Sequence, residues 1–252
     1  MDTKKLMKGI LSPVTMATSF LFMLNNITVQ GLAFFAPTIV RTIYPDKSTV
    51  TQQLFTVPPY VVGGFFTLVL PLISWRLDKR QIVMIATTPL VIVGYSMFLG
   101  TTNPSARYAA TFLLSSSVFA NGPLSNSQVS ANVVSDTARS SAIGLNGEFL
   151  SPSIPLSRTP ANIFSPVMMG NVGGLIATWS YLPFDGPNYP IGNGLNLAAC
   201  CTVGIISTAT LFWMKMDNKK REGRSSEEET AGMSQLEIQN LDWKHPDFRW
   251  KP

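Results

Sequence analysis

The longest stretch of the chain without a charged residue is GILSPVTMATSFLFMLNNITVQGLAFFAPTIV, residues 9–40. This stretch is longer than the roughly 20 apolar residues with which an α-helix crosses the hydrocarbon core of a bilayer. A helix that faces water on one side carries charged or polar side chains on that side every few residues. The stretch therefore predicts a membrane-spanning helix.

The same pattern recurs along the chain. Charged residues before Lys219 fall in narrow clusters that bound five charge-free runs and a sixth, 140–184, broken only by Glu148 and Arg158. Charged residues make up 13% of the sequence, below the roughly 25% typical of soluble domains. We therefore predict an all-α membrane protein with six transmembrane helices. The first, second, third and sixth crossings lie within Ile10–Ala36, Leu54–Trp75, Ile82–Leu99 and Leu195–Met214. The fourth begins near Tyr108 and the fifth near Ser140.

The basic residues predict the orientation. With a cytoplasmic N-terminus, twelve Lys and Arg residues flank the crossings on the cytoplasmic side, and only Arg41, Lys47 and Arg107 lie outside. Because cytoplasmic loops carry the excess of Lys and Arg, both termini are expected in the cytoplasm. The expected layout is a cytoplasmic N-terminal segment at 1–8, a six-helix transmembrane unit at 9–216 and a cytoplasmic C-terminal tail at 217–252.

Residues 147–166 interrupt this layout, because they hold four prolines and two charged residues and show no helical period. Without them, Ser140–Asn146 joins Val167–Phe184 as one uncharged crossing. Codons for Gly147–Phe149 and for Ser165–Val167 can contain splice-donor and splice-acceptor strings. We interpret the insertion as a retained intron in the gene model. The alternative is a genuine loop, which would place prolines and charges at membrane depth.

Motifs for catalysis or for a cofactor are missing from the sequence. It has no phosphate-binding Gly-Lys-Ser/Thr loop, no nucleotide-binding glycine pattern and no histidine–carboxylate set. Cys200 and Cys201 are adjacent in an apolar run, far from the single histidine, His245, so neither a disulfide nor a metal site is expected. The net charge of +5 comes from basic residues at helix ends, which favours a membrane face over nucleic acid.

Neutral amides gather instead within the first and fourth predicted crossings. An amide in hydrocarbon is costly unless it faces a partner or a wet cavity. A single amide fits an interhelical hydrogen bond equally well, but a cluster favours a solvated path for a substrate. The spacing adds support, because residues four apart share a helix face. The predicted path residues are Asn25, Asn26, Gln30, Asn121, Asn126 and Gln128.

The end of the tail, residues 242–252, mixes aromatic and basic side chains. Two interpretations remain open from the sequence. The segment rests on the headgroups of the inner leaflet, or it is a flexible end.

Several further stretches of the sequence form a recognisable set of motifs. They are GLAFFAPTIVR at 31–41, TVPPYVVG at 56–63, RYAA at 107–110, QVSANVVSDTARSS at 128–141, DGPNYP at 185–190 and LDWKHP at 241–246. With these motifs the chain resembles fungal anion:cation symporters, which are major facilitator proteins related to allantoate and nicotinate permeases. The resemblance covers nearly the whole chain except 147–166.

This resemblance implies a function and partners. Members of the family have twelve crossings in two six-helix halves, and this chain resembles the second half, so the partner implied is the N-terminal half. The family takes up small organic anions together with protons, through a cavity lined by the first and fourth helices of each half. The resemblance also implies that this chain is a multi-pass protein of the plasma membrane. The alternative expectation is a truncated membrane polypeptide that does not transport; a membrane-embedded enzyme is disfavoured because catalytic groups are missing.

Overall fold

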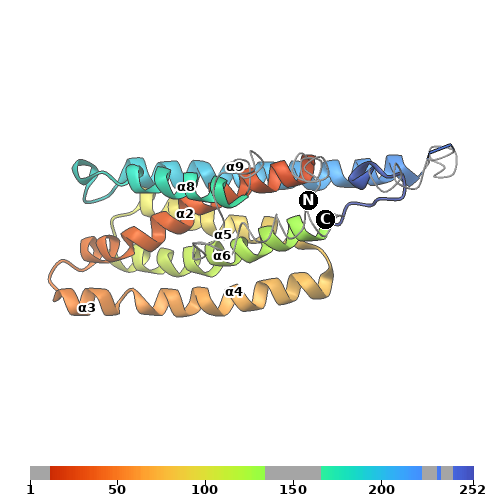
Figure 1. Cartoon of the computed structure of the whole chain (residues 1–252). Helices are drawn as coiled ribbons and strands as arrows, with labels where there is room; N and C mark the ends of the chain where they lie inside the picture. Colours follow the sequence, from red (N-terminus) through yellow and green to blue (C-terminus); the bar gives the residue numbers. More distant parts are fainter. Residues whose placement is uncertain (1–11, 134–165, 223–231, 234–240) are drawn as a thin grey trace, which may run out of the picture.

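The computed structural model describes residues 12–133, 166–222, 232–233 and 241–252. These residues form long helices that lie lengthwise beside one another (Figure 1), and none of them is in a β-strand. The long helices are α2 (Pro13–Ile43), α4 (Val57–Leu77), α5 (Arg80–Gly100), α6 (Pro104–Ala131), α8 (Pro166–Ser180) and α9 (Pro190–Glu222). Short helical turns are α3 (Thr49–Leu54), η2 (Pro183–Asp185) and η3 (Asp242–Lys244).

Polar residues followed by proline start two of the long helices. The Ser12 hydroxyl accepts a hydrogen bond from the Thr15 backbone N–H at 3.2 Å, at the start of α2. At the start of α6, Asn103 Oδ1 accepts from the Ser105 N–H at 2.9 Å. Such caps satisfy backbone donors that the first helical turn leaves free, and a proline in that turn has no N–H to satisfy.

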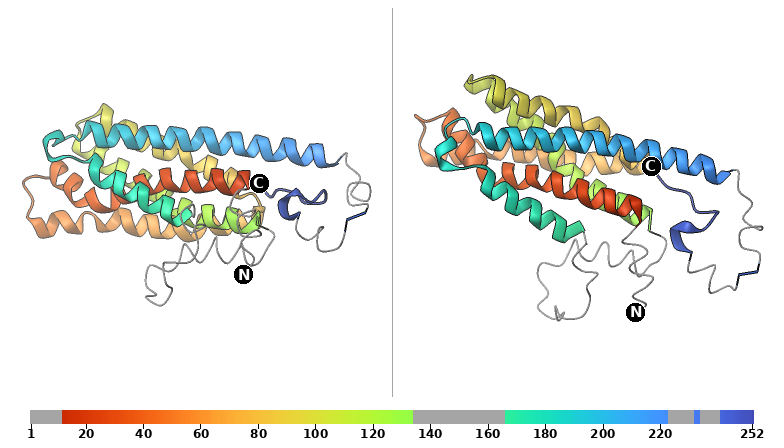
Figure 2. Two further views of the ribbon diagram at one scale, coloured as in Figure 1. Left: turned by 45° about the horizontal axis from the view of Figure 1, so that its top comes forward. Right: turned by 90° about the horizontal axis from the view of Figure 1, so that it is seen from above.

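Helices α2 and α6 hold the bundle together. α2 packs against α6, α8 and α9, while α6 also packs against α4 and α5. In the right-hand view of Figure 2, α2 lies between α8 and α9. Side chains such as Leu32, Tyr95 and Leu114 form a continuous core between α2, α5 and α6.

Four helical segments of the described chain are long and apolar enough to cross a membrane: Pro13–Ile43, Thr49–Leu77, Arg80–Gly100 and Pro190–Glu222. Helix α6 is 28 residues long, but its polar side chains lower its hydropathy. Those polar groups, such as Ser117 and Gln128, are buried against neighbouring helices. Large apolar side chains such as Phe65 and Leu68 of α4 face outward. The described chain is therefore an all-α membrane protein with four spans evident by composition.

Three sequence expectations fall on residues outside the described ranges. They are the N-terminal segment at 1–8, the predicted start of the fifth crossing at Ser140, and the insertion at 147–166, of which only Pro166 is described. Within the described chain, α8 begins at Pro166 and covers the later part of the predicted fifth crossing.

Residues 242–252 are not a flexible end. This segment is packed against the helix ends, and Trp250 is only 2% exposed. The interpretation that the segment rests on the headgroups of the inner leaflet stays a prediction. α9 also continues to Glu222, past the expected start of the tail at 217. An ion pair between Arg221 and Asp217, four residues apart at 2.7 Å, supports this extra turn.

Candidate substrate path

A small polar cavity lies inside the bundle, between α2, α5, α6 and α9. The centre of a water molecule can occupy ≈ 10 Å³ of this cavity, so the cavity holds roughly one water. Its residues are Asn25, Thr28, Thr88, Val91, Asn121, Cys200 and Val203. Two of the six predicted path residues, Asn25 and Asn121, therefore meet at one place.

The cavity amides are only partly satisfied by protein groups. Asn25 Nδ2 lies 3.5 Å from the Val118 carbonyl oxygen of α6, which is at the limit of a hydrogen bond. Asn121 Oδ1 accepts from the Thr87 hydroxyl of α5 at 3.2 Å. Both amides are buried, so the space beside them suits a water or a polar group of a ligand.

Asn26 and Gln30 point to a different place, the seam between α2 and α8. A side-chain carbon added at Gly170 would collide with Asn26 Nδ2, and one added at Gly174 would lie 3.4 Å from Gln30 Cγ. Both amides are half-buried, so each keeps a part of its surface open. Small residues on α8 thus let the two helices approach closely with polar side chains at the edge of the seam.

The two remaining path residues lie further along α6. Asn126 is half-buried. Gln128 is fully buried, and its Nε2 donates to the Lys251 carbonyl oxygen at 3.0 Å. The six predicted residues thus occupy the internal cavity, the α2–α8 seam and the end of α6, and the structure does not bring them into one group.

Sequence reasoning missed three polar residues of the cavity: Thr28, Thr88 and Cys200. The Thr28 hydroxyl lies 3.6 Å from Cys200 Sγ, and the Thr88 hydroxyl donates to the Met84 carbonyl of its own helix at 3.0 Å. Such hydroxyls are common in membrane helices because they satisfy themselves within the helix, so the sequence gives no signal that singles them out. Among the described residues, no group of His, Cys, Asp and Glu is arranged to hold a metal ion.

Curated proteins similar to the chain are fungal transporters. An MFS-type transporter, cnsO, of Penicillium expansum is 24% identical over 90% of this chain and 40% of its own length. The chain resembles fungal major facilitator transporters. Two others are the high-affinity nicotinic acid transporter of Saccharomyces cerevisiae and the major facilitator-type transporter hxnP of Emericella nidulans. The nicotinic acid transporter is 21% identical over 89% of this chain and 38% of its own length. The transporter hxnP is 23% identical over 87% of this chain and 40% of its own length.

The chain spans about two fifths of the length of these major facilitator transporters. They are named as transporters and not as enzymes, in agreement with the lack of catalytic motifs in the sequence. No protein-family model matches the chain. No solved structure matches it either.

Proposed function

We propose that the chain is the C-terminal half of a secondary active transporter that carries a small organic anion together with protons. The observation that carries this proposal is the similarity to fungal transporters over about nine tenths of the chain. One of these relatives is named for nicotinic acid, a small carboxylic acid. A carboxylate, vitamin or ureide is therefore the substrate class that we propose.

The proposal includes six crossings of the plasma membrane, with both termini on its cytoplasmic side. Helices α6 and α8 would complete the four spans that are evident by composition. The distribution of basic residues along the sequence supports this orientation, since twelve of them flank the crossings on the proposed cytoplasmic side.

The size of the internal cavity bears on where the substrate moves. With space for roughly one water, the cavity is too small for an organic anion. We therefore place the substrate path on the surface of this half, where half-buried Asn26, Gln30 and Asn126 keep open faces. Asn25, Asn121 and Gln128 lie beneath this surface and would support it. A second half would cover the path from the other side.

Uptake measurements test the proposal. The gene is deleted in its own organism, and uptake of radiolabelled nicotinate and other small carboxylates is measured at external pH values of about 5 and 7, with and without a protonophore. Uptake of one anion should fall on deletion, return with the restored gene, increase at acid pH and stop with the protonophore, as proton coupling requires. Unchanged uptake of the whole panel would contradict the proposal.

A second candidate is a membrane polypeptide that does not transport. One observation favours keeping it: the cavity between α2, α5, α6 and α9 is too small for a solute. The same deletion strain separates the candidates. Uptake that is restored by the intact locus, and not by the 252 residues alone, indicates that a further half is needed. Uptake that never depended on the locus supports the non-transporting candidate.

A further inference from the structure

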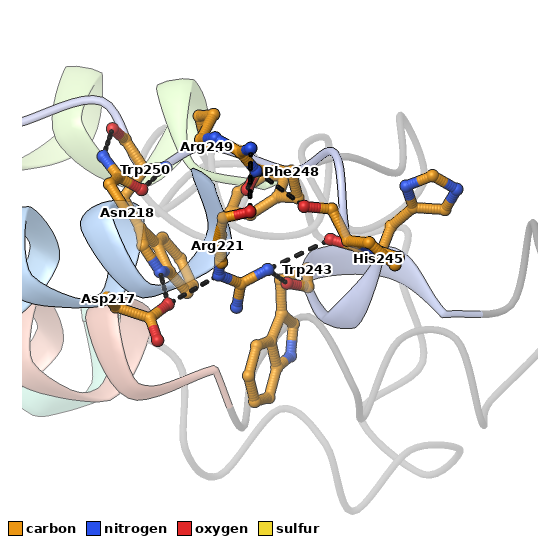
Figure 3. Close-up of polar contacts among 9 residues, drawn as sticks. Asp217, Asn218, Arg221, Trp243, His245, Phe248, Arg249 and Trp250 are labelled. Atoms are coloured by element: carbon orange, nitrogen blue, oxygen red, sulfur yellow. Dashed lines mark hydrogen bonds and ion pairs between the residues drawn. The ribbon is translucent and has the colours of Figure 1, made fainter. Parts of the chain in front are cut away.

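The last eleven residues, Asp242–Pro252, are here named the strap. The strap returns to the end of α9 and is held there by paired hydrogen bonds (Figure 3). Asn218 Oδ1 accepts from the Trp250 N–H at 2.8 Å, while Asn218 Nδ2 donates to the Trp250 carbonyl at 2.9 Å. The indole N–H of Trp250 donates to Asp217 Oδ2 at 2.7 Å. One tryptophan of the strap is therefore bound through its backbone and its ring.

Arg221, also on α9, holds the first part of the strap. Its guanidinium donates to the carbonyl oxygens of Trp243 and His245 at 3.1 and 3.0 Å, as Figure 3 shows. The same guanidinium lies 5.9 Å from the ring centres of Phe248 and Trp250. Arg221 is 8% exposed, so these bonds are shielded from water, which strengthens them.

The end of the strap crosses from α9 to α6 and α5. Asn132, which follows α6, accepts from the Lys251 N–H at 2.8 Å and donates to the Lys251 carbonyl at 3.0 Å. Gln128 donates to the same carbonyl at 3.0 Å. The first residue of α5, Arg80, donates its backbone N–H to the Pro252 carbonyl at 3.1 Å.

Apolar contacts join α2 to the helices that the strap contacts. Val14 near the start of α2, Met214 of α9 and Trp250 form a buried cluster, with Trp243 and Phe248 packed against it. Trp250 thus lies where the ends of α2 and α9 meet. The buried area of a tryptophan makes such a side chain a strong anchor.

Helix α4 differs from the four helices that the strap joins. No hydrogen bond or ring contact of the strap among the described residues reaches α4. α4 lies along the outer edge of the bundle in Figure 1. In the most apolar part of the α3–α4 segment 11% is buried, compared with 28% for α9 and 44% each for α2 and α5.

We propose that the strap is an intramolecular latch that ties the ends of α2, α5, α6 and α9 into one block and leaves α4 outside it. The four helices then move together, because separating their ends breaks strap hydrogen bonds to α5, α6 and α9 and, for α2, the buried apolar cluster around Trp250. α4 can shift against this block without breaking a strap contact. The latch is a property of the half bundle, so it holds whichever solute is carried and can be tested without uptake.

Hydrogen–deuterium exchange on the purified protein tests the latch. Trp250→Ala removes the anchor, and Trp179→Ala is the matched control because Trp179 is 75% exposed on α8. In Trp250→Ala, amides at the strap-side ends of α2, α5 and α6 should exchange at least about tenfold faster, as expected for lost buried contacts. Amides of α4 should be unchanged, and Trp179→Ala should match the parent protein at all these sites.

Asn218→Ala gives an independent result if Trp250→Ala does not fold. It removes two hydrogen bonds to the strap and leaves intact the apolar cluster that holds α2, so the strap-side ends of α5 and α6 should exchange faster. Unchanged exchange at these ends in the folded variants would overturn the proposal. Equal acceleration in α4 and in the four strapped helices would overturn it as well, because α4 would then belong to the block.

Discussion

Amide side chains of the same chemistry serve different purposes in this bundle, according to what packs across from them. Asn25 and Asn121, two of the six predicted path residues, line one small cavity because their helices are neighbours. Gln128 was predicted for the same path, but it binds the carbonyl of Lys251, 123 residues away. Helical periodicity shows which residues share a face of one helix, and it does not show which distant segment covers that face.

At this scale we predict that Asn26→Leu and Asn126→Leu each lower uptake by about tenfold, the effect of losing one hydrogen bond of roughly 1.4 kcal/mol to the substrate. Surface expression should stay near that of the parent protein, because both amides are half-buried at the edge of the bundle. Gln53→Leu is the control, since Gln53 is exposed on α3, away from the proposed path. Normal uptake in both variants, or loss of folded protein in both, would exclude these amides from the path.

Close helix contacts at the scale of the element depend on individual glycines. Gly63 of α4 faces α6, and an added side-chain carbon would lie 2.7 Å from Phe119 Cδ2 and 3.0 Å from the Ser115 carbonyl. An added carbon at the adjacent Gly64 meets nothing within 4 Å. The two glycines look alike in the sequence, and only the packing of α4 on α6 separates them.

This difference predicts opposite effects from one substitution. Gly63→Ala should destabilise the protein by about 1–3 kcal/mol, because the new methyl group overpacks the seam between α4 and α6. Gly64→Ala should be neutral or stabilise it by about 0.5–1 kcal/mol, since alanine favours the helix more than glycine does. Thermal unfolding in detergent measures both. Equal melting temperatures for the two variants would mean that α4 does not pack on α6 through Gly63.

The length of α8 bears on the insertion. The described helix has 15 residues and is about 22 Å long at 1.5 Å per residue, shorter than the roughly 30 Å hydrocarbon core. Joining Asn146 directly to Val167 would add Ser140–Asn146 to this helix and give it the length of a crossing. The order and the approximate bounds of the other helices followed from charge clusters and prolines, which mark helix ends in the sequence itself.

We therefore predict that the mature transcript lacks the codons for residues 147–166. Reverse transcription and sequencing across this region should show Asn146 followed directly by Val167. Transcripts that all retain the segment would refute the intron hypothesis. The segment would then be a genuine loop, and Ser140–Asn146 would not be continuous with α8.

For the molecule as a whole, the structure places the start of α2 and the strap at the same end of the bundle (Figure 1). Four of the six predicted crossings are evident by composition in the described chain, and they were predictable because a bilayer imposes a charge-free pattern on every crossing. The strap was not predictable, because its hydrogen bonds reach α9 more than twenty positions away and the end of α6 more than a hundred positions away. Its aromatic and basic composition suits a membrane surface as well as a protein groove.

The proposed orientation predicts which end of α9 can be labelled from outside the cell. α9 has 33 residues and spans about 50 Å at 1.5 Å per residue, so its two ends lie on opposite faces of a membrane. A membrane-impermeant thiol reagent on intact cells should label Phe184→Cys, in the exposed turn before α9, and not Lys220→Cys near its other end. The parent protein, with Cys200 and Cys201, is the background control. Labelling of Lys220→Cys and not of Phe184→Cys would reverse the orientation.

The strap also has a practical consequence for handling the protein. Membrane proteins are commonly followed with a fluorescent reporter or an affinity tag joined to the last residue, on the assumption that this residue hangs free. Here the Pro252 carbonyl is bonded to the backbone of Arg80, and Trp250 is buried two residues earlier. A bulky fusion after Pro252 would have to fit beside the start of α5 or pull the strap away from the bundle. Yields obtained with and without such a fusion should not be treated as equivalent.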